Sequence, residues 1–146
     1  MGKYFGADGF RGEVNINLTS KHAYIIGRFL GWYCKQYDIY GAKPRIVVGR
    51  DTRQSGEMLE SAIISGLTAS GADVYILNVI PTPGLAFLTK NDNFNYGVMI
   101  TASHNPYYDN GIKIFNHLGE KIDDEMITLI EAYIEEFSSS DDNIPL

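Results

Sequence analysis

The chain has 146 residues, of which 45% are hydrophobic and 21% charged, the balance of an ordinary globular protein of one domain. Its net charge of -6 disfavours nucleic-acid partners, because phosphate backbones attract basic surfaces. No apolar run approaches the length of a membrane span, and residues 1–6 lack the apolar segment of a signal peptide. The single cysteine excludes an intrachain disulfide. We therefore expect a cytoplasmic protein without membrane partners.

Helices and strands are expected to alternate, because apolar side chains recur at helical spacing in some segments and form short continuous runs in others. Helices are expected from Thr19 or Ser20 to about Tyr37, from Ser55 to a stop at Gly71, from Thr82 to residues 91–93, and from Asp123 to about Phe137. Strands are expected over residues 45–49, 73–77, 96–100 and 112–115, and the first two of them are expected to be buried.

This alternation predicts an α/β fold with three layers, α/β/α, around a mixed, mostly parallel four-stranded sheet. The third and fourth strands are separated by about eleven residues without a helical pattern, which is short for a parallel crossover, so we expect this pair to be antiparallel. Residues 1–137 are interpreted as one domain. Residues 138–146 have the composition of a linker and are expected to be mobile.

The segment Thr101-Ala102-Ser103-His104-Asn105-Pro106 follows a predicted strand, where α/β proteins often bind ligands. Ser103 has three interpretations: a turn serine, a hydrolase nucleophile, or a carrier of phosphate. The hydrolase is disfavoured because neighbouring side chains of an extended segment point to opposite sides, which keeps His104 from acting as the base, and because the segment lacks a Gly-x-Ser-x-Gly pattern. A phosphorylated serine needs cations and backbone donors instead.

Candidate cations and donors occur in three other segments. The glycine-rich segment 5–12 carries Asp8 and Arg11, and its glycines allow a backbone to approach a phosphate closely. Arg50 and Asp51 follow a predicted strand. Lys113 lies in the last predicted strand. A tight turn, an arginine–aspartate ion pair and a surface lysine are the ordinary explanations of these three features.

Four segments together, Gly6–Gly12, Gly49–Arg53, Thr101–Pro106 and Asn110–Lys113, resemble in order and spacing the first domain of the α-D-phosphohexomutases, over residues 3–137. Within that superfamily the segments look most like the phosphoglucosamine mutase subfamily. Ala7 stands where that subfamily usually has threonine. Thr101 is the usual residue of the phosphoglucomutases and phosphomannomutases, which therefore stay as alternatives.

The resemblance implies an intramolecular phosphotransferase, an isomerase of carbohydrate metabolism that interconverts hexose 6-phosphate and 1-phosphate through a sugar bisphosphate, with glucosamine phosphate as the first choice. Ser103 would carry the phosphate and give one oxygen ligand to Mg²⁺. The implied catalytic residues are Ser103, Lys113 as a possible general acid/base, Arg11 and His104. The implied supporting residues are Asp8, Gly9, Arg50, Asp51, Asn105 and Asn110.

The family's second domain supplies an acidic Mg²⁺ loop, and this chain has no Asp-x-Asp-x-Asp pattern. The sugar-recognition and phosphate-binding loops of the family's later domains are also missing. We therefore expect the chain to be the N-terminal domain of a longer enzyme, with a phosphosugar substrate and the downstream domains as its partners, and to be inactive alone. A stand-alone, non-catalytic phosphate-binding domain is the alternative.

Overall fold

The computed structural model describes residues 2–37 and 43–138, so the predicted linker lies outside the described residues apart from Ser138. The strands are β1 (Phe5–Gly6), β2 (Gly9–Glu13), β3 (Arg45–Arg50), β4 (Asp73–Val79), β5 (Tyr96–Ile100) and β6 (Asp109–Asn116). The helices are α1 (Ser20–Gln36), α2 (Gly56–Ala69), α3 (Thr82–Asn91) and α4 (Asp124–Ser138).

The strands form one mixed sheet in the order β1-β2-β6-β5-β3-β4. β3 is parallel to both β4 and β5, and β5 pairs with β6 in the predicted antiparallel direction. The predicted number of four strands is wrong, because β1 and β2 form a hairpin that adds to the edge of β6. With that hairpin, three of the five neighbouring pairs are antiparallel, so the sheet is not mostly parallel.

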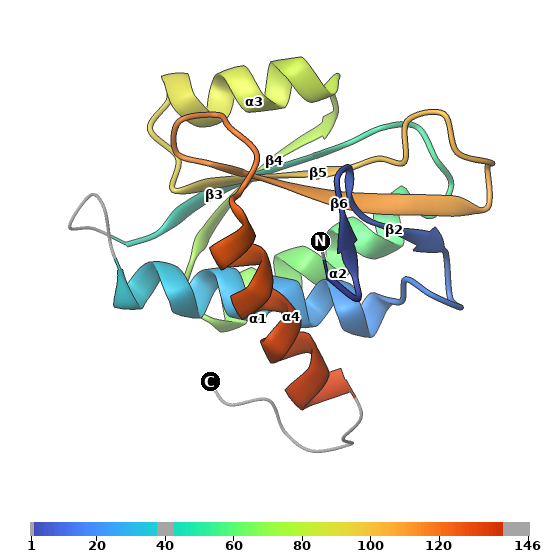
Figure 1. Cartoon of the computed structure of the whole chain (residues 1–146). Helices are drawn as coiled ribbons and strands as arrows, with labels where there is room; N and C mark the ends of the chain where they lie inside the picture. Colours follow the sequence, from blue (N-terminus) through green and yellow to red (C-terminus); the bar gives the residue numbers. More distant parts are fainter. Residues whose placement is uncertain (1, 38–42, 139–146) are drawn as a thin grey trace.

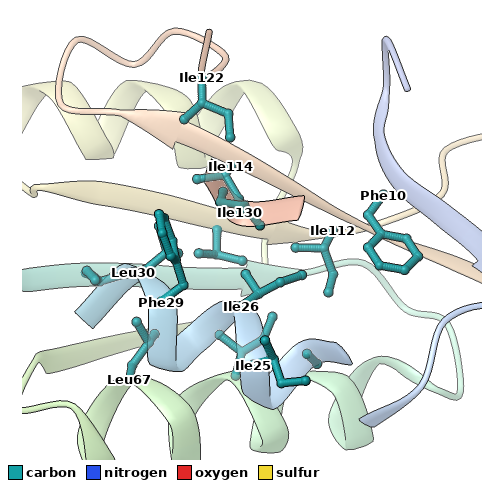
Figure 2. Packing of buried hydrophobic residues seen from close by; sticks show 14 of the residues in the cluster. Phe10, Ile25, Ile26, Phe29, Leu30, Leu67, Ile112, Ile114, Ile122 and Ile130 are labelled. Atoms are coloured by element: carbon teal, nitrogen blue, oxygen red, sulfur yellow. The ribbon is translucent and has the colours of Figure 1, made fainter. Parts of the chain in front are cut away.

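The three-layer architecture is confirmed: α3 covers one face of the sheet, and α1, α2 and α4 lie on the other (Figure 1). The main core fills the space between the sheet and the helices of the second face. Figure 2 shows this core, where Ile112 and Ile114 of β6 meet side chains of α1 such as Ile26 and Phe29. Successive strand residues point to opposite faces, so Lys113, between these two isoleucines, lies on the α3 face.

The prediction that residues 73–77 form a buried strand is wrong. β4 is the edge of the sheet and pairs only with β3. Tyr75 and Ile76 are 43% and 48% exposed, respectively, although the sequence around them is as apolar as that of a central strand. Apolar content alone does not distinguish an edge strand from a central one, because the difference lies in whether a neighbour covers it.

The start of α1 is tied to the β1–β2 hairpin through His22. Thr19 caps the helix by accepting a hydrogen bond from the His22 backbone, and the His22 ring nitrogen Nδ1 accepts one from the Thr19 backbone at 3.1 Å. The imidazole ring also packs beside Tyr4 and Phe10. Burial, and to a smaller extent the charge of Lys21, lowers the pKa of His22 below its ordinary value of 6.5.

We expect acid to destabilise the fold through His22. The unfolded chain binds a proton near the ordinary pKa of 6.5, whereas the folded chain resists protonation because the imidazole is partly buried and lies near the positive charge of Lys21. Stability therefore falls as the pH drops below about 6.5 and continues to fall until the pH reaches the lowered pKa of the folded state. Melting temperatures measured between pH 7.5 and 5, as approximate limits around that pKa, test this.

The matched variant is His22→Gln, since glutamine at this position preserves the capping box but does not titrate. The His22→Gln protein should lose less stability over the same pH range than the parent chain. An identical pH dependence in the two proteins would show that other groups are responsible.

Candidate functional site

Ser103 lies on the turn that follows β5, and local hydrogen bonds fix this turn. Its backbone N–H donates to the Thr101 hydroxyl at 3.1 Å, and the Asn105 N–H donates to the Ala102 carbonyl at 3.0 Å. The φ angle of Ser103 is +52°, a left-handed conformation that is uncommon for residues other than glycine. Such a conformation persists only where the surroundings enforce it, and it presents the exposed Ser103 side chain at the end of the sheet.

Arg11 is the cation that reaches the Ser103 side chain. Its Nη2 atom donates to Ser103 Oγ at 3.1 Å, and its Nη1 atom lies 3.4 Å from Asn105 Oδ1 and 3.6 Å from an Asp8 carboxylate oxygen. The register of the sheet sets this reach, because Arg11 on β2 stands opposite Gly111 on β6. A Cβ atom on Gly111 would lie only 2.9 Å from Arg11 Cγ, so glycine leaves the room that the arginine stem occupies.

Arg53 holds the backbone of the same loop. Its guanidinium donates to the carbonyl oxygens of Ser103 (3.0 Å), Asn105 (2.9 Å), Pro106 (2.6 Å) and Asp109 (3.1 Å). Asp51 orients this arginine through an ion pair at 3.4 Å and accepts a hydrogen bond from the Thr101 hydroxyl at 2.7 Å. Two arginines thus bind two different parts of Ser103: Arg11 the hydroxyl and Arg53 the carbonyl.

Arg53 was missed as a site residue, although it lies in the Gly49–Arg53 segment that the sequence indicated. The available signal was its position three residues beyond Arg50, just past the end of β3. Arg50, which the sequence placed in the site, points instead to α2. It lies 3.4 Å from a carboxylate oxygen of Glu57 and 3.4 Å from one of Glu60. The Arg50–Glu60 contact is an ion pair without the alignment of a hydrogen bond.

The structure brings several of the other predicted residues to the loop. Asn105 donates through Nδ2 to Asp109 at 3.1 Å, which braces the turn from inside. Asn110 is fully buried, donates to Ser55 Oγ at 2.9 Å and accepts from the Gly111 backbone at 2.8 Å. Both amides act on the shape of the loop, and neither contacts the Ser103 hydroxyl.

Two predicted catalytic residues are not in contact with the Ser103 hydroxyl. His104 is exposed, and within the described ranges no hydrogen bond joins it to another residue. Lys113 lies on the α3 face of β6 and lines a cavity of about 260 Å³ together with Asp8, Thr82 and Lys121. Gly9, with a φ of +88°, lies against this part of β6, where a Cβ atom would approach Lys113 Cγ to 3.1 Å.

This arrangement suits an anion bonded to Ser103. In the part of the chain that the structure describes, Arg11 is the only hydrogen-bond partner of Ser103 Oγ, so no carboxylate or imidazole is placed there to remove the hydroxyl proton. An arginine at this position stabilises negative charge that the serine oxygen carries, as charge-assisted donors do around a phosphate.

The described residues do not by themselves form a metal site, since among them no group of three or more His, Cys, Asp or Glu side chains lies close enough to hold a metal ion. Mg²⁺ prefers near-octahedral oxygen coordination, which one serine-bound oxygen does not supply. Over the same residues, no helix has the length and apolar character needed to cross a membrane.

Comparison with known proteins places this geometry in a family. A family model described as "Phosphoglucomutase/phosphomannomutase, alpha/beta/alpha domain I" matches residues 2–141. The chain belongs to this family of phosphohexomutase domains.

Among curated relatives, the phosphoglucosamine mutase of Lachnoclostridium phytofermentans is 53% identical over 137 residues, covering 92% of this chain and 29% of the relative. That of Streptococcus sanguinis is 52% identical over 145 residues, covering 99% of this chain and 31% of the relative. The chain therefore spans about 30% of the length of these relatives.

A solved structure, a phosphoglucomutase/phosphomannomutase family protein from Burkholderia thailandensis, superposes with a TM-score of 0.79 at 30% identity over 91% of this chain and 30% of that chain. The fold is thus shared with a phosphohexomutase.

Arg53→Ala should loosen the serine loop, because four carbonyl oxygens each lose the donor that the guanidinium supplies. We expect a loss of about 2–3 kcal/mol in the free energy of unfolding and faster hydrogen exchange at residues 102–109. Arg53→Lys should recover little of the lost stability, because the lysine ammonium lacks the planar array of donors that a guanidinium presents.

Arg45→Ala is the matched control, because Arg45 also donates to two backbone carbonyls, those of Asp92 and Asn93, at the other end of β3. It should leave exchange in residues 102–109 unchanged. If Arg53→Ala also left that exchange unchanged, the guanidinium would not be what fixes the loop.

Proposed function

We propose that this chain is the first domain of a phosphoglucosamine mutase, with residues 1–137 as the domain and 138–146 as the linker to the next one. In the whole enzyme, Ser103 carries a phosphate. The observation that carries the proposal is the Ser103 hydroxyl at 3.1 Å from Arg11, on a loop that Arg53 fixes, with no base hydrogen-bonded to that hydroxyl among the described residues. The 52–53% identity to phosphoglucosamine mutases supports glucosamine phosphate as the substrate.

The reaction transfers the phosphoryl group twice. In the first transfer, the bond from phosphorus to Ser103 Oγ breaks as a bond forms to the free hydroxyl oxygen of the sugar monophosphate, and that hydroxyl gives up its proton. The sugar bisphosphate then reorients within the site, so that its other phosphate faces Ser103. In the second transfer, its other phosphate returns to Ser103, so glucosamine 6-phosphate leaves as glucosamine 1-phosphate. Catalysis of this kind depends on positioning and charge stabilisation.

The residues divide these tasks. Arg11 stabilises the negative charge on the serine oxygen as the phosphoryl group departs. Arg53 and Asp51 hold the loop so that Ser103 does not move between the two transfers. Lys113, which lines the neighbouring cavity with Asp8, is the candidate for accepting and returning the sugar hydroxyl proton. His104 and Asn105 would contact the phosphate or its loop from the exposed side.

Mg²⁺ is proposed as the cofactor of the whole enzyme. A phosphoserine at position 103 would supply one oxygen ligand, and the remaining ligands would come from chain beyond these 146 residues. When bound, the ion would neutralise charge on the transferring phosphoryl group. The proposed location is the cytoplasm, where phosphosugar metabolism takes place, with the downstream domains as partners.

One residue, Thr101, favours the phosphoglucomutase and phosphomannomutase alternative. Its hydroxyl accepts a hydrogen bond from the Ser103 N–H and donates one to Asp51. Substrate preference distinguishes the two. The full-length enzyme should turn over glucosamine phosphate with a higher kcat/KM than glucose or mannose phosphate. The reverse order would assign it to the glucose and mannose enzymes.

In the full-length enzyme, Ser103→Ala should abolish mutase activity, and phosphopeptide mass spectrometry of the parent should locate phosphate on Ser103. Arg11→Ala should lower kcat by about a hundredfold or more, by the usual effect of removing one donor from a transferring anion. Ser65→Ala, an exposed serine on α2, is the matched control and should be active.

Phosphate located elsewhere together with a fully active Ser103→Ala enzyme would refute the assignment. The 146-residue chain alone should show no turnover of sugar phosphates. Measurable turnover by that chain would show that this domain contains the complete site.

A further inference from the structure

A second cavity lies at the end of β5 and β6 opposite to the Ser103 loop, since Tyr96 begins β5 and Asn116 ends β6. It has a volume of about 360 Å³, within the usual range for small-ligand pockets. Its lining comes from α1, β5, β6 and the start of α4. The lining residues that matter for the argument are Tyr33, Tyr37, Tyr96, His117, Asp123 and Glu125.

Aromatic rings form one side of this tyrosine pocket. Tyr33 lies in the last turn of α1 and Tyr37 is the residue that caps this helix, and their ring centroids are 4.7 Å apart. Tyr96 faces them from β5 and is half-buried, and its hydroxyl forms no hydrogen bond with the part of the chain that the structure describes. A half-buried hydroxyl that no described residue engages has a hydrogen-bonding position for a ligand.

Two carboxylates, those of Asp123 and Glu125, also line the pocket. Asp123 accepts the Met126 backbone N–H at 2.9 Å and so caps α4, and Glu125 lies in the first turn of that helix. Neither forms an ion pair within the described ranges. Among the described residues that line the pocket there is no lysine or arginine, and His117 is the only basic side chain.

The electrostatic character of the pocket follows from these groups. Burial is the main cause that raises the pKa of Tyr96, and the nearby Tyr33 and Asp123 raise it further. Burial likewise raises the pKa of Tyr33, with Glu125 and Asp123 contributing. Burial opposes a charge of either sign, whereas the negative charges of Asp123 and Glu125 oppose a bound anion and favour a bound cation.

We propose that the tyrosine pocket binds an organic ammonium ion. The faces of aromatic rings attract ammonium groups, Asp123 and Glu125 supply the opposite charge, and the Tyr96 hydroxyl can accept a hydrogen bond from a primary ammonium. The ion could be a free quaternary amine or the side chain of a lysine from another protein. This site is independent of the proposed phosphoryl transfer, because it lies at the other end of the same strands.

The test is an NMR titration of the 146-residue chain with two probes, choline for a free quaternary amine and butylammonium for a lysine side chain. Sodium chloride holds the ionic strength constant, and 3,3-dimethylbutan-1-ol, which has the shape of choline without its charge, is the neutral control. At least one cation should give saturable shifts at Tyr33, Tyr37 and Tyr96, whereas the alcohol should not. The cation that binds more tightly shows whether the natural ligand is a free quaternary amine or a lysine side chain.

Variants separate the contributions. Asp123→Asn with Glu125→Gln removes both charges and keeps an N-cap, and should weaken binding about tenfold, whereas Glu136→Gln, an exposed site on the same helix, should not. Tyr96→Phe should weaken the binding of butylammonium, which loses a hydrogen-bond acceptor, but not the binding of choline. Absence of a saturable shift with either cation, equal binding of the alcohol, or unchanged binding by the double variant would overturn the proposal.

Discussion

The serine loop depends on one guanidinium group. The carbonyl oxygens of Ser103, Asn105, Pro106 and Asp109 converge on Arg53, so the negative ends of their dipoles point to one fixed cation. This convergence accounts for the left-handed backbone of Ser103, because a conformation that costs energy is retained where several stronger contacts require it. It also leaves Arg11 as the partner of the hydroxyl. Backbone shape and side-chain charge are therefore controlled by different residues from different strands.

Sheet topology brings these residues together from positions far apart in the sequence. Arg53 follows β3, Ser103 follows β5 and Arg11 lies on β2, with β6 standing between β2 and β5. The antiparallel return of β6 is essential, since it carries Gly111 to the position where the Arg11 side chain crosses towards the loop. An acidic chain thus brings two arginines to one loop, which its composition does not reveal, because the order of the strands collects side chains from distant segments.

The sequence predicted the parts of the fold that have a clear periodicity or a constrained loop length. The four helices, the central strands and the antiparallel β5–β6 pair were of this kind. It did not predict the β1–β2 hairpin, because glycines leave the segment 5–12 without an alternating pattern. Nor could it separate Arg50 from Arg53: the direction of each depends on how the chain turns after β3, which local pattern does not determine. The contact between Arg11 and Ser103 depends on strand order, which comes from long-range pairing.

The two ends of β5 and β6 have opposite chemical character on the same scaffold. The end that bears Ser103 presents arginines, whereas the end that bears Tyr96 presents phenols and carboxylates. A single apolar core separates them, with Ile100 and Ile112 at one end and Ile114 near the other. Because charges on opposite sides of that core are separated by several strand residues and partly exposed to solvent, they are largely screened from each other. The same pair of strands can therefore support an anion at one end without weakening the negative character of the other.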